Sequence, residues 1–126
     1  MRRMTPCLLV VEDDRELMPL LHLSLVDIGG LSMHPCYDGA GALAALDGGL
    51  NPDLVLLDLN LPDMDGADLL WEIRARGHPT LPVVFLTGTT GKDVIARLHS
   101  LGAAGVLAKP FDPQTLAQEV GQFIPE

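Results

Sequence analysis

Short apolar runs alternate with segments of helical periodicity five times along this chain, and this alternation restricts its fold more than any other feature. The apolar runs cover residues 7–11, 31–36, 54–57, 81–86 and 105–108. Strands that alternate with helices of this length form right-handed βαβ units, because two parallel strands need a long crossover connection. The sequence therefore predicts an α/β protein with a mostly parallel sheet.

The first helical segment carries both start and stop signals. Asp14 is the predicted N-cap, and Gly29 and Gly30 end the helix. Pro19 would fall in the second turn of a helix that starts at Arg15, so we expect a late start or a kink. The predicted buried stripe consists of Leu17, Leu20, Leu21, Ser24 and Ile28, which are spaced three or four residues apart.

The remaining elements are predicted in the same way. Pro35 assigns the run 31–36 to an edge of the sheet, since proline cannot donate to a neighbouring strand. Further helices are expected at 40–46, from Ala67 to Gly77, between Gly91 and Gly102, and after Asp112. In the last helix Asp112 is the predicted N-cap and Pro113 the first residue, with one apolar face of Leu116, Val120, Phe123 and Ile124.

Polar side chains follow four of the five apolar runs. Glu12 and Asp13 end the first run, and Asp58 ends the most strongly buried one. Thr87 and Lys109 end the fourth and fifth. Because the carboxyl ends of parallel strands open onto one crevice, these side chains are predicted to converge there.

The chemistry of this set indicates a divalent cation. Three close carboxylates repel one another unless a cation lies between them, and so few hard oxygen ligands suit Mg²⁺ with several waters. A carboxylate beside Mg²⁺, with a lysine and a hydroxyl near anionic oxygens, is suited to accept a phosphoryl group. Asp58 is the predicted nucleophile.

Four segments, VVEDD, VLLDLNLPDMDG, VVFLTG and GAAGVLAKPF, resemble in order and spacing the receiver domain of two-component response regulators. The resemblance covers essentially the whole chain, so residues 1–126 are expected to form a single receiver domain. It implies a doubly wound, flavodoxin-like (βα)5 fold with a five-stranded parallel sheet in the order 2-1-3-4-5.

The resemblance also implies a function and roles for residues. Phosphate would pass from a phosphohistidine of a sensor histidine kinase or histidine phosphotransfer protein to Asp58. Mg²⁺ would be bound by Asp13, Asp58 and the Asn60 carbonyl, with Glu12 acting through a water. Lys109 would contact the phosphoryl group. Thr87 and the adjacent loop, with Gly88, Thr89, Thr90 and Gly91, would then switch the binding of a downstream partner, or of an output domain missing from this chain.

Three further expectations follow from the family. The chain would not be an enzyme beyond its own phosphoryl acceptance and autodephosphorylation. The Lys109–Pro110 bond is a candidate cis peptide. The signalling surface would expose Lys92, Arg97, His99, Gln114 and Gln118. One position departs from the family, because Val106 stands where an aromatic residue is usual, three residues before the lysine.

Alternative functions rest on weaker patterns. A receiver-like scaffold that is never phosphorylated is disfavoured, since the acceptor, the acid pair and the lysine are all present. Gly39, Gly41 and Ala44 imitate a dinucleotide fingerprint, but the preceding strand contains Pro35 and the helix is short. Asp63 and Asp65 imitate the DxDG motif of haloacid dehalogenase phosphatases, but no apolar strand directly precedes them.

Charge and cysteine content restrict the partners and the compartment. A net charge of −9 opposes direct binding to nucleic acid and to anionic membranes. Cys7 and Cys36 fit no metal-ligand spacing, so reduced and mostly buried thiols are expected. The apolar run after the basic N-terminus is too short for a signal or a membrane span, and a cytoplasmic protein is predicted.

Overall fold

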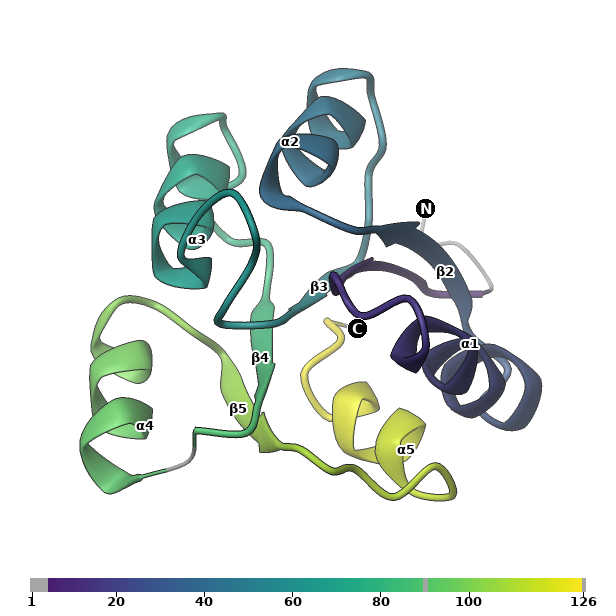
Figure 1. Cartoon of the computed structure of the whole chain (residues 1–126). Helices are drawn as coiled ribbons and strands as arrows, with labels where there is room; N and C mark the ends of the chain where they lie inside the picture. The colour runs from purple at the N-terminus through teal and green to yellow at the C-terminus, as the bar shows by residue number, and fades with distance from the viewer. Residues whose placement is uncertain (1–4, 90, 126) are drawn as a thin grey trace.

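The computed structural model describes residues 5–89 and 91–125 and shows a twisted parallel sheet between two layers of helices (Figure 1). The strands are β1 (Cys7–Val11), β2 (Ser32–Cys36), β3 (Leu54–Leu57), β4 (Val83–Thr87) and β5 (Gly105–Ala108). Their order is β2-β1-β3-β4-β5, and every neighbouring pair is parallel. The predicted doubly wound fold, its strand order and the edge position of the strand that contains Pro35 are confirmed.

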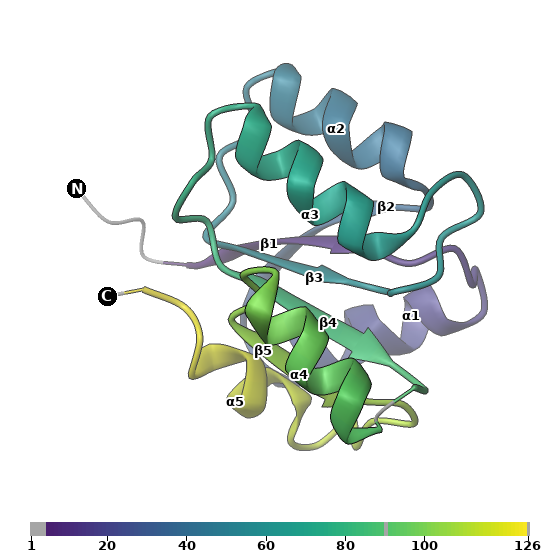
Figure 2. The ribbon, with the colours of Figure 1, turned by 90° about the vertical axis from the view of Figure 1, so that its left-hand side faces the viewer.

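The helices are α1 (Leu17–His22), continued by the π-helical segment η1 (Leu23–Ile28), then α2 (Gly39–Asp47), α3 (Gly66–Ala75), α4 (Lys92–Ser100) and α5 (Leu116–Gly121). Helices α2, α3 and α4 cover one face of the sheet, and α1 and α5 cover the other (Figures 1 and 2). None of the helices within the described ranges is long and apolar enough to cross a membrane.

The central strands β1, β3 and β4 are buried on both faces, and their side chains divide between two cores by simple alternation. Leu9, Val55 and Phe85 point to the core under α2–α4. Leu8, Leu56 and Val84 point to the core under α1 and α5. The strand ends are therefore fixed from both sides, which holds the side chains that follow them.

Helix α1 starts late, as Pro19 predicts. Pro19 has no N–H for the Arg15 carbonyl, so the regular helix begins only at Leu17. Asp14 still satisfies the free backbone groups, because its side chain accepts the N–H of Glu16 at 2.9 Å and of Leu17 at 3.2 Å. The cap position itself is Glu16 rather than the predicted Asp14.

The predicted buried stripe of this helix is partly wrong. Leu20 and Ile28 are 37% and 44% exposed, whereas Met18 and Leu25 are buried. Apolar residues occur all round the segment, so spacing alone permits several stripes, and the wider turns of η1 then shift the register. The buried Ser24 hydroxyl donates a hydrogen bond to the Pro113 carbonyl at 2.8 Å and so ties this segment to the start of the last helical region.

The last helix also begins later than predicted. Regular α5 starts at Leu116 with Thr115 at the cap position, while Asp112 and Pro113 belong to a preceding turn. That turn is closed by the Asp112 side chain, which accepts the Gln114 N–H at 2.9 Å, and by its carbonyl, which accepts the N–H groups of Thr115 and Leu116. Of the predicted apolar face, Leu116 and Val120 lie on α5, whereas Phe123 and Ile124 follow its end at Gly121. All four side chains pack on the core under α1 and α5.

Two smaller predictions are confirmed. The Lys109–Pro110 peptide is cis. Both cysteines are free thiols, Cys36 buried and Cys7 half-buried.

Candidate functional site

Three carboxylates meet at the carboxyl edge of the sheet. Glu12 follows β1 and is buried, Asp13 is exposed, and Asp58 follows the adjacent strand β3. One carboxylate oxygen from each lies within 4.8 Å of the others. The Asp58 N–H donates to the Val11 carbonyl at 3.0 Å, so the ladder between the two strands itself sets this proximity.

Lys109 reaches this cluster from the edge strand β5. It follows β5, which β4 and β3 separate from β1. Its Nζ lies 2.5 Å from Glu12 Oε1 and 3.4 Å from Asp58 Oδ2, while its side chain is only 23% exposed. One largely buried ammonium group therefore forms ion pairs with two carboxylates.

The protonation of this group follows from its surroundings. Burial raises the pKa of Glu12 above its ordinary value, although the hydrogen bond from Lys109 opposes this. Burial alone would lower the pKa of Lys109, but the hydrogen bond to Glu12 and the charges of Glu12 and Asp58 outweigh it and leave the pKa raised. Lys109 is therefore a fixed positive charge at neutral pH.

The oxygens of Glu12 are both engaged inside the protein. Oε1 accepts from Lys109, and Oε2 accepts the Asp14 N–H at 3.1 Å. Asp58 makes a single weak local contact beside Lys109, with its Oδ1 accepting the Asn60 N–H at 3.3 Å. Asp13 and Asp58 thus offer more open oxygens than Glu12 does.

Thr87 is placed at the end of β4, beside β5. Its side chain is 1% exposed, and its hydroxyl accepts the Thr89 N–H at 3.1 Å. Its carbonyl accepts the Lys109 N–H at 2.9 Å, which joins the ends of β4 and β5. Of the loop predicted to switch, Gly88, Thr89 and Gly91 are described, and Thr90 lies outside the described residues.

Val106 lies on β5 opposite Phe85 and is half-buried against the core under α2–α4. The position that is usually aromatic is therefore filled by a short, branched side chain packed from one side. Its dominant rotamer leaves it little freedom to move.

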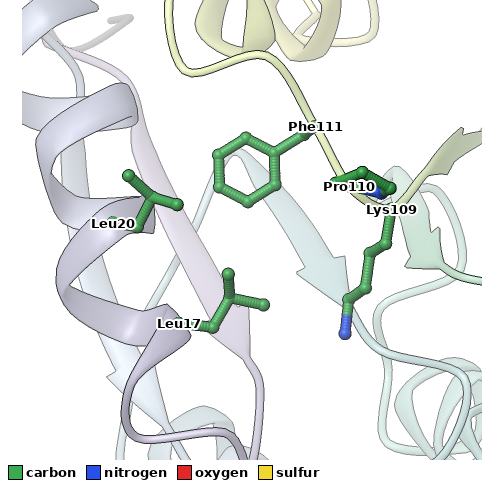
Figure 3. A pocket seen from close by; sticks show the side chains of 5 residues that line it. All are labelled: Leu17, Leu20, Lys109, Pro110 and Phe111. Atoms are coloured by element: carbon green, nitrogen blue, oxygen red, sulfur yellow. The ribbon is translucent and has the colours of Figure 1, made fainter.

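An apolar pocket adjoins Lys109, and the sequence did not predict it. Leu17 and Leu20 from α1 face Pro110 and Phe111 from the segment after β5, with the Lys109 side chain at the rim (Figure 3). Leu20 had been assigned to the core. Two features of the sequence could have indicated this pocket. The first helix carries more apolar residues than one buried stripe needs, and a phenylalanine directly follows the Lys–Pro pair.

The two imitated motifs have structural roles instead. The N–H groups of Gly39 and Ala40, which a pyrophosphate would need, both donate to the Asp63 carboxylate at 2.9 Å. Asp63 is therefore a capping residue in an exposed loop, and Asp65 caps α3 by accepting the Ala67 N–H at 2.7 Å. Neither pattern forms a catalytic site here.

Fold and site together define a doubly wound α/β protein with an acidic, lysine-bearing pocket at the carboxyl edge of its sheet. Residues 8–121 match the response regulator receiver domain family. The chain belongs to this family.

Individual relatives agree with this assignment. The chain is 40% identical over 114 residues to the transcriptional regulatory protein CpxR of Klebsiella pneumoniae, covering 90% of this chain and 47% of CpxR. It is 38% identical over 103 residues to the DNA-binding transcriptional regulator NtrC of Escherichia coli, covering 82% of this chain and 21% of NtrC. It thus spans half or less of these relatives.

Solved structures show the same fold. The chemotaxis response regulator CheY4 of Vibrio cholerae superposes with a TM-score of 0.86 at 26% identity, over 95% of this chain and 99% of that one. Receiver domains are generally non-catalytic signal transducers that bind Mg²⁺ in an acidic pocket and interact with histidine kinases and output domains. The acidic pocket of this chain fits that description.

Proposed function

We propose that this chain is a phosphorelay receiver that accepts a phosphoryl group on Asp58. The observation that carries the proposal is the cluster of Glu12, Asp13 and Asp58 with Lys109 bridging two of them. The donor is the phosphohistidine of a histidine kinase or phosphotransfer protein, and residues 1–126 act as one receiver domain. The cytoplasmic location stays a prediction from the sequence.

The donor atoms fit Mg²⁺. Carboxylate oxygens this close together are hard ligands that gain from a divalent cation. Asp13, Asp58 and the Asn60 carbonyl are the proposed direct ligands. Glu12 acts through a water, since its own oxygens already accept from Lys109 and Asp14. When bound, the metal neutralises charge on the transferring phosphoryl oxygens.

The residues of the chain then divide the transfer between them. An Asp58 oxygen attacks phosphorus and forms the O–P bond, while the N–P bond breaks and the imidazole nitrogen keeps the electron pair. Lys109 places its charge beside Asp58 and stabilises the phosphoryl oxygens. The apolar pocket beside Lys109 gives a donor protein surface to bury.

The direct test uses the purified chain, Mg²⁺ and a small acyl-phosphate donor, with intact mass spectrometry as the readout. One phosphoryl group should be added, and a chelator should prevent the addition. A chain that gains no phosphoryl group in Mg²⁺ would instead support the scaffold alternative.

Mg²⁺ is expected to stabilise the fold by mass action. At a concentration of 100 times the Kd this amounts to about 2.7 kcal/mol in the free energy of unfolding. Asp13→Ala should remove most of that gain and also raise metal-free stability, because it relieves repulsion. Urea unfolding with and without Mg²⁺ measures both effects. Asp68→Ala, on an exposed acid outside the cluster, is the matched control, and a wild-type midpoint indifferent to millimolar Mg²⁺ would contradict the site.

The switch is proposed to work through Thr87 and the backbone that follows it. If the Thr87 hydroxyl turns to the phosphoryl group, the Thr89 N–H loses its acceptor, so its amide resonance should shift on phosphorylation. Thr87→Ala should remove this response at equal phosphorylation, and Thr87→Ser should keep it.

Val106→Ala tests the alternative route through β5. We expect it to preserve the Thr89 response and to cost about 1 kcal/mol of stability for the lost packing. A folded, phosphorylated Val106→Ala chain without the Thr89 response would assign the switch to β5. The surface proposed to report it, Lys92, Arg97, His99, Gln114 and Gln118, is exposed as predicted.

A further inference from the structure

Asp63 caps a helix to which it does not belong. It lies in the loop between β3 and α3, yet its Oδ1 accepts the N–H of Gly39 and its Oδ2 that of Ala40, both at 2.9 Å. The third free N–H of α2, that of Gly41, goes to the local cap Asp38 at 2.7 Å. The first turn of α2 is therefore satisfied by two aspartates from different parts of the chain.

The contact is strengthened by packing and charge. Next to Asp63, the Met64 side chain lies against Gly39 so closely that a Cβ there would meet Met64 Sδ at 2.5 Å. The two hydrogen bonds from α2 lower the pKa of Asp63. The carboxylate is ionised throughout the neutral range, and its bonds are charge-assisted.

The same loop carries Asn60. Two backbone contacts bring the ends of this loop together. The Gly66 N–H donates to the Leu59 carbonyl at 2.6 Å, and Asn60 and Asp65 form an isolated antiparallel bridge. The tip of this closed segment is held to the start of α2 through Asp63 and Met64, and Leu59 and Leu61 pack against the core under α2–α4. The clamp to α2 is therefore one of the contacts that fix the backbone at Asn60.

We propose that Asp63 is a positioning residue for the metal site: by clamping the loop to α2, it fixes the Asn60 backbone carbonyl where a divalent cation needs it. This inference rests on the proposed function, because it requires that carbonyl as a ligand. Asp63 itself touches neither the metal nor the phosphoryl group. Removing Asp63 would open the clamp, and the Asn60 carbonyl would no longer be preorganised for the metal.

The test is calorimetric titration of the whole unphosphorylated chain with Mg²⁺. Asp63→Ala should weaken Mg²⁺ binding about 10-fold, as is typical when a group that orients a metal ligand is removed. Asp63→Asn keeps one acceptor oxygen and the side-chain shape, so its Mg²⁺ affinity should lie between those of wild type and Asp63→Ala. At saturating Mg²⁺ the rate of phosphorylation of both variants should return to that of wild type.

Asp38→Ala is the matched control, since it uncaps the same helix without releasing the loop. Its Mg²⁺ affinity should stay close to that of wild type. An equal loss in Asp38→Ala would overturn the inference in favour of general weakening of α2, and unchanged affinity in Asp63→Ala and Asp63→Asn would overturn it outright. Absence of Mg²⁺ binding by wild type would overturn the proposed function and, with it, this role of Asp63.

Discussion

Asp58→Asn is expected to accept no phosphoryl group under conditions that fully phosphorylate the wild-type chain. The amide has nearly the shape of the carboxylate and keeps an oxygen for the Asn60 N–H, but it lacks the anionic oxygen that attacks phosphorus. Intact mass after incubation with Mg²⁺ and an acyl phosphate measures the result directly. Asp68→Asn, which removes an exposed acid on α3, should be phosphorylated normally.

A second readout shows that the Asp58→Asn chain is folded. Without metal it should be at least as stable as wild type, because one of three mutually repelling carboxylates has lost its charge. Lys109 retains Glu12 as its partner. A phosphoryl group added to this variant would show that another residue is the acceptor.

Lys109→Met should slow phosphorylation by about 100- to 1000-fold, the usual cost of removing one preorganised charge from a transfer site. Methionine keeps most of the apolar stem, so the loss reports the ammonium rather than the packing. Lys109→Arg retains the charge and should lose less. The measurement is the rate of phosphoryl addition at saturating Mg²⁺, and a rate near that of wild type in Lys109→Met would contradict the assigned role.

The same substitution should change how metal-free stability depends on pH. Lys109→Met leaves the buried Glu12 without its cation, which raises the already elevated pKa of this carboxyl further. A carboxyl whose pKa is raised on folding stabilises the fold below its ordinary value and loses that contribution as pH rises through the folded value. In chelator, the variant should therefore lose more stability than wild type between about pH 4.5 and neutrality. Parallel urea curves across this range measure it.

Strand positions could be predicted from sequence because both faces of this sheet are covered. Each of the central strands β1, β3 and β4 is then a continuous apolar run with a sharp polar end, as at Leu57 and Asp58. The stripe of α1 could not be predicted in the same way. Its apolar residues surround the helix, so their spacing does not decide between Leu20, which is exposed, and Met18, which is buried.

The gathering of site residues could be predicted for a geometric reason. Parallel strands carry whatever follows them to one edge, which brings Glu12, Asp13 and Asp58 together. The pairing of Lys109 with Glu12 depends on side-chain reach across two strands, which no spacing in the sequence encodes. The clamp by Asp63 was missed for a similar reason, since its partners lie 23 and 24 residues away.

The edge strand β2 has a consequence for how copies of this chain meet. Cys36 directs its carbonyl inward to Glu12, and Ser32 directs its N–H inward to Pro6, so Met33 and Pro35 direct their backbone groups outward. Because proline carries no N–H, Met33 is the single outward donor within β2. An incoming strand finds too few donors there to extend the sheet. This free edge is thereby protected against the intermolecular pairing that leads to aggregation.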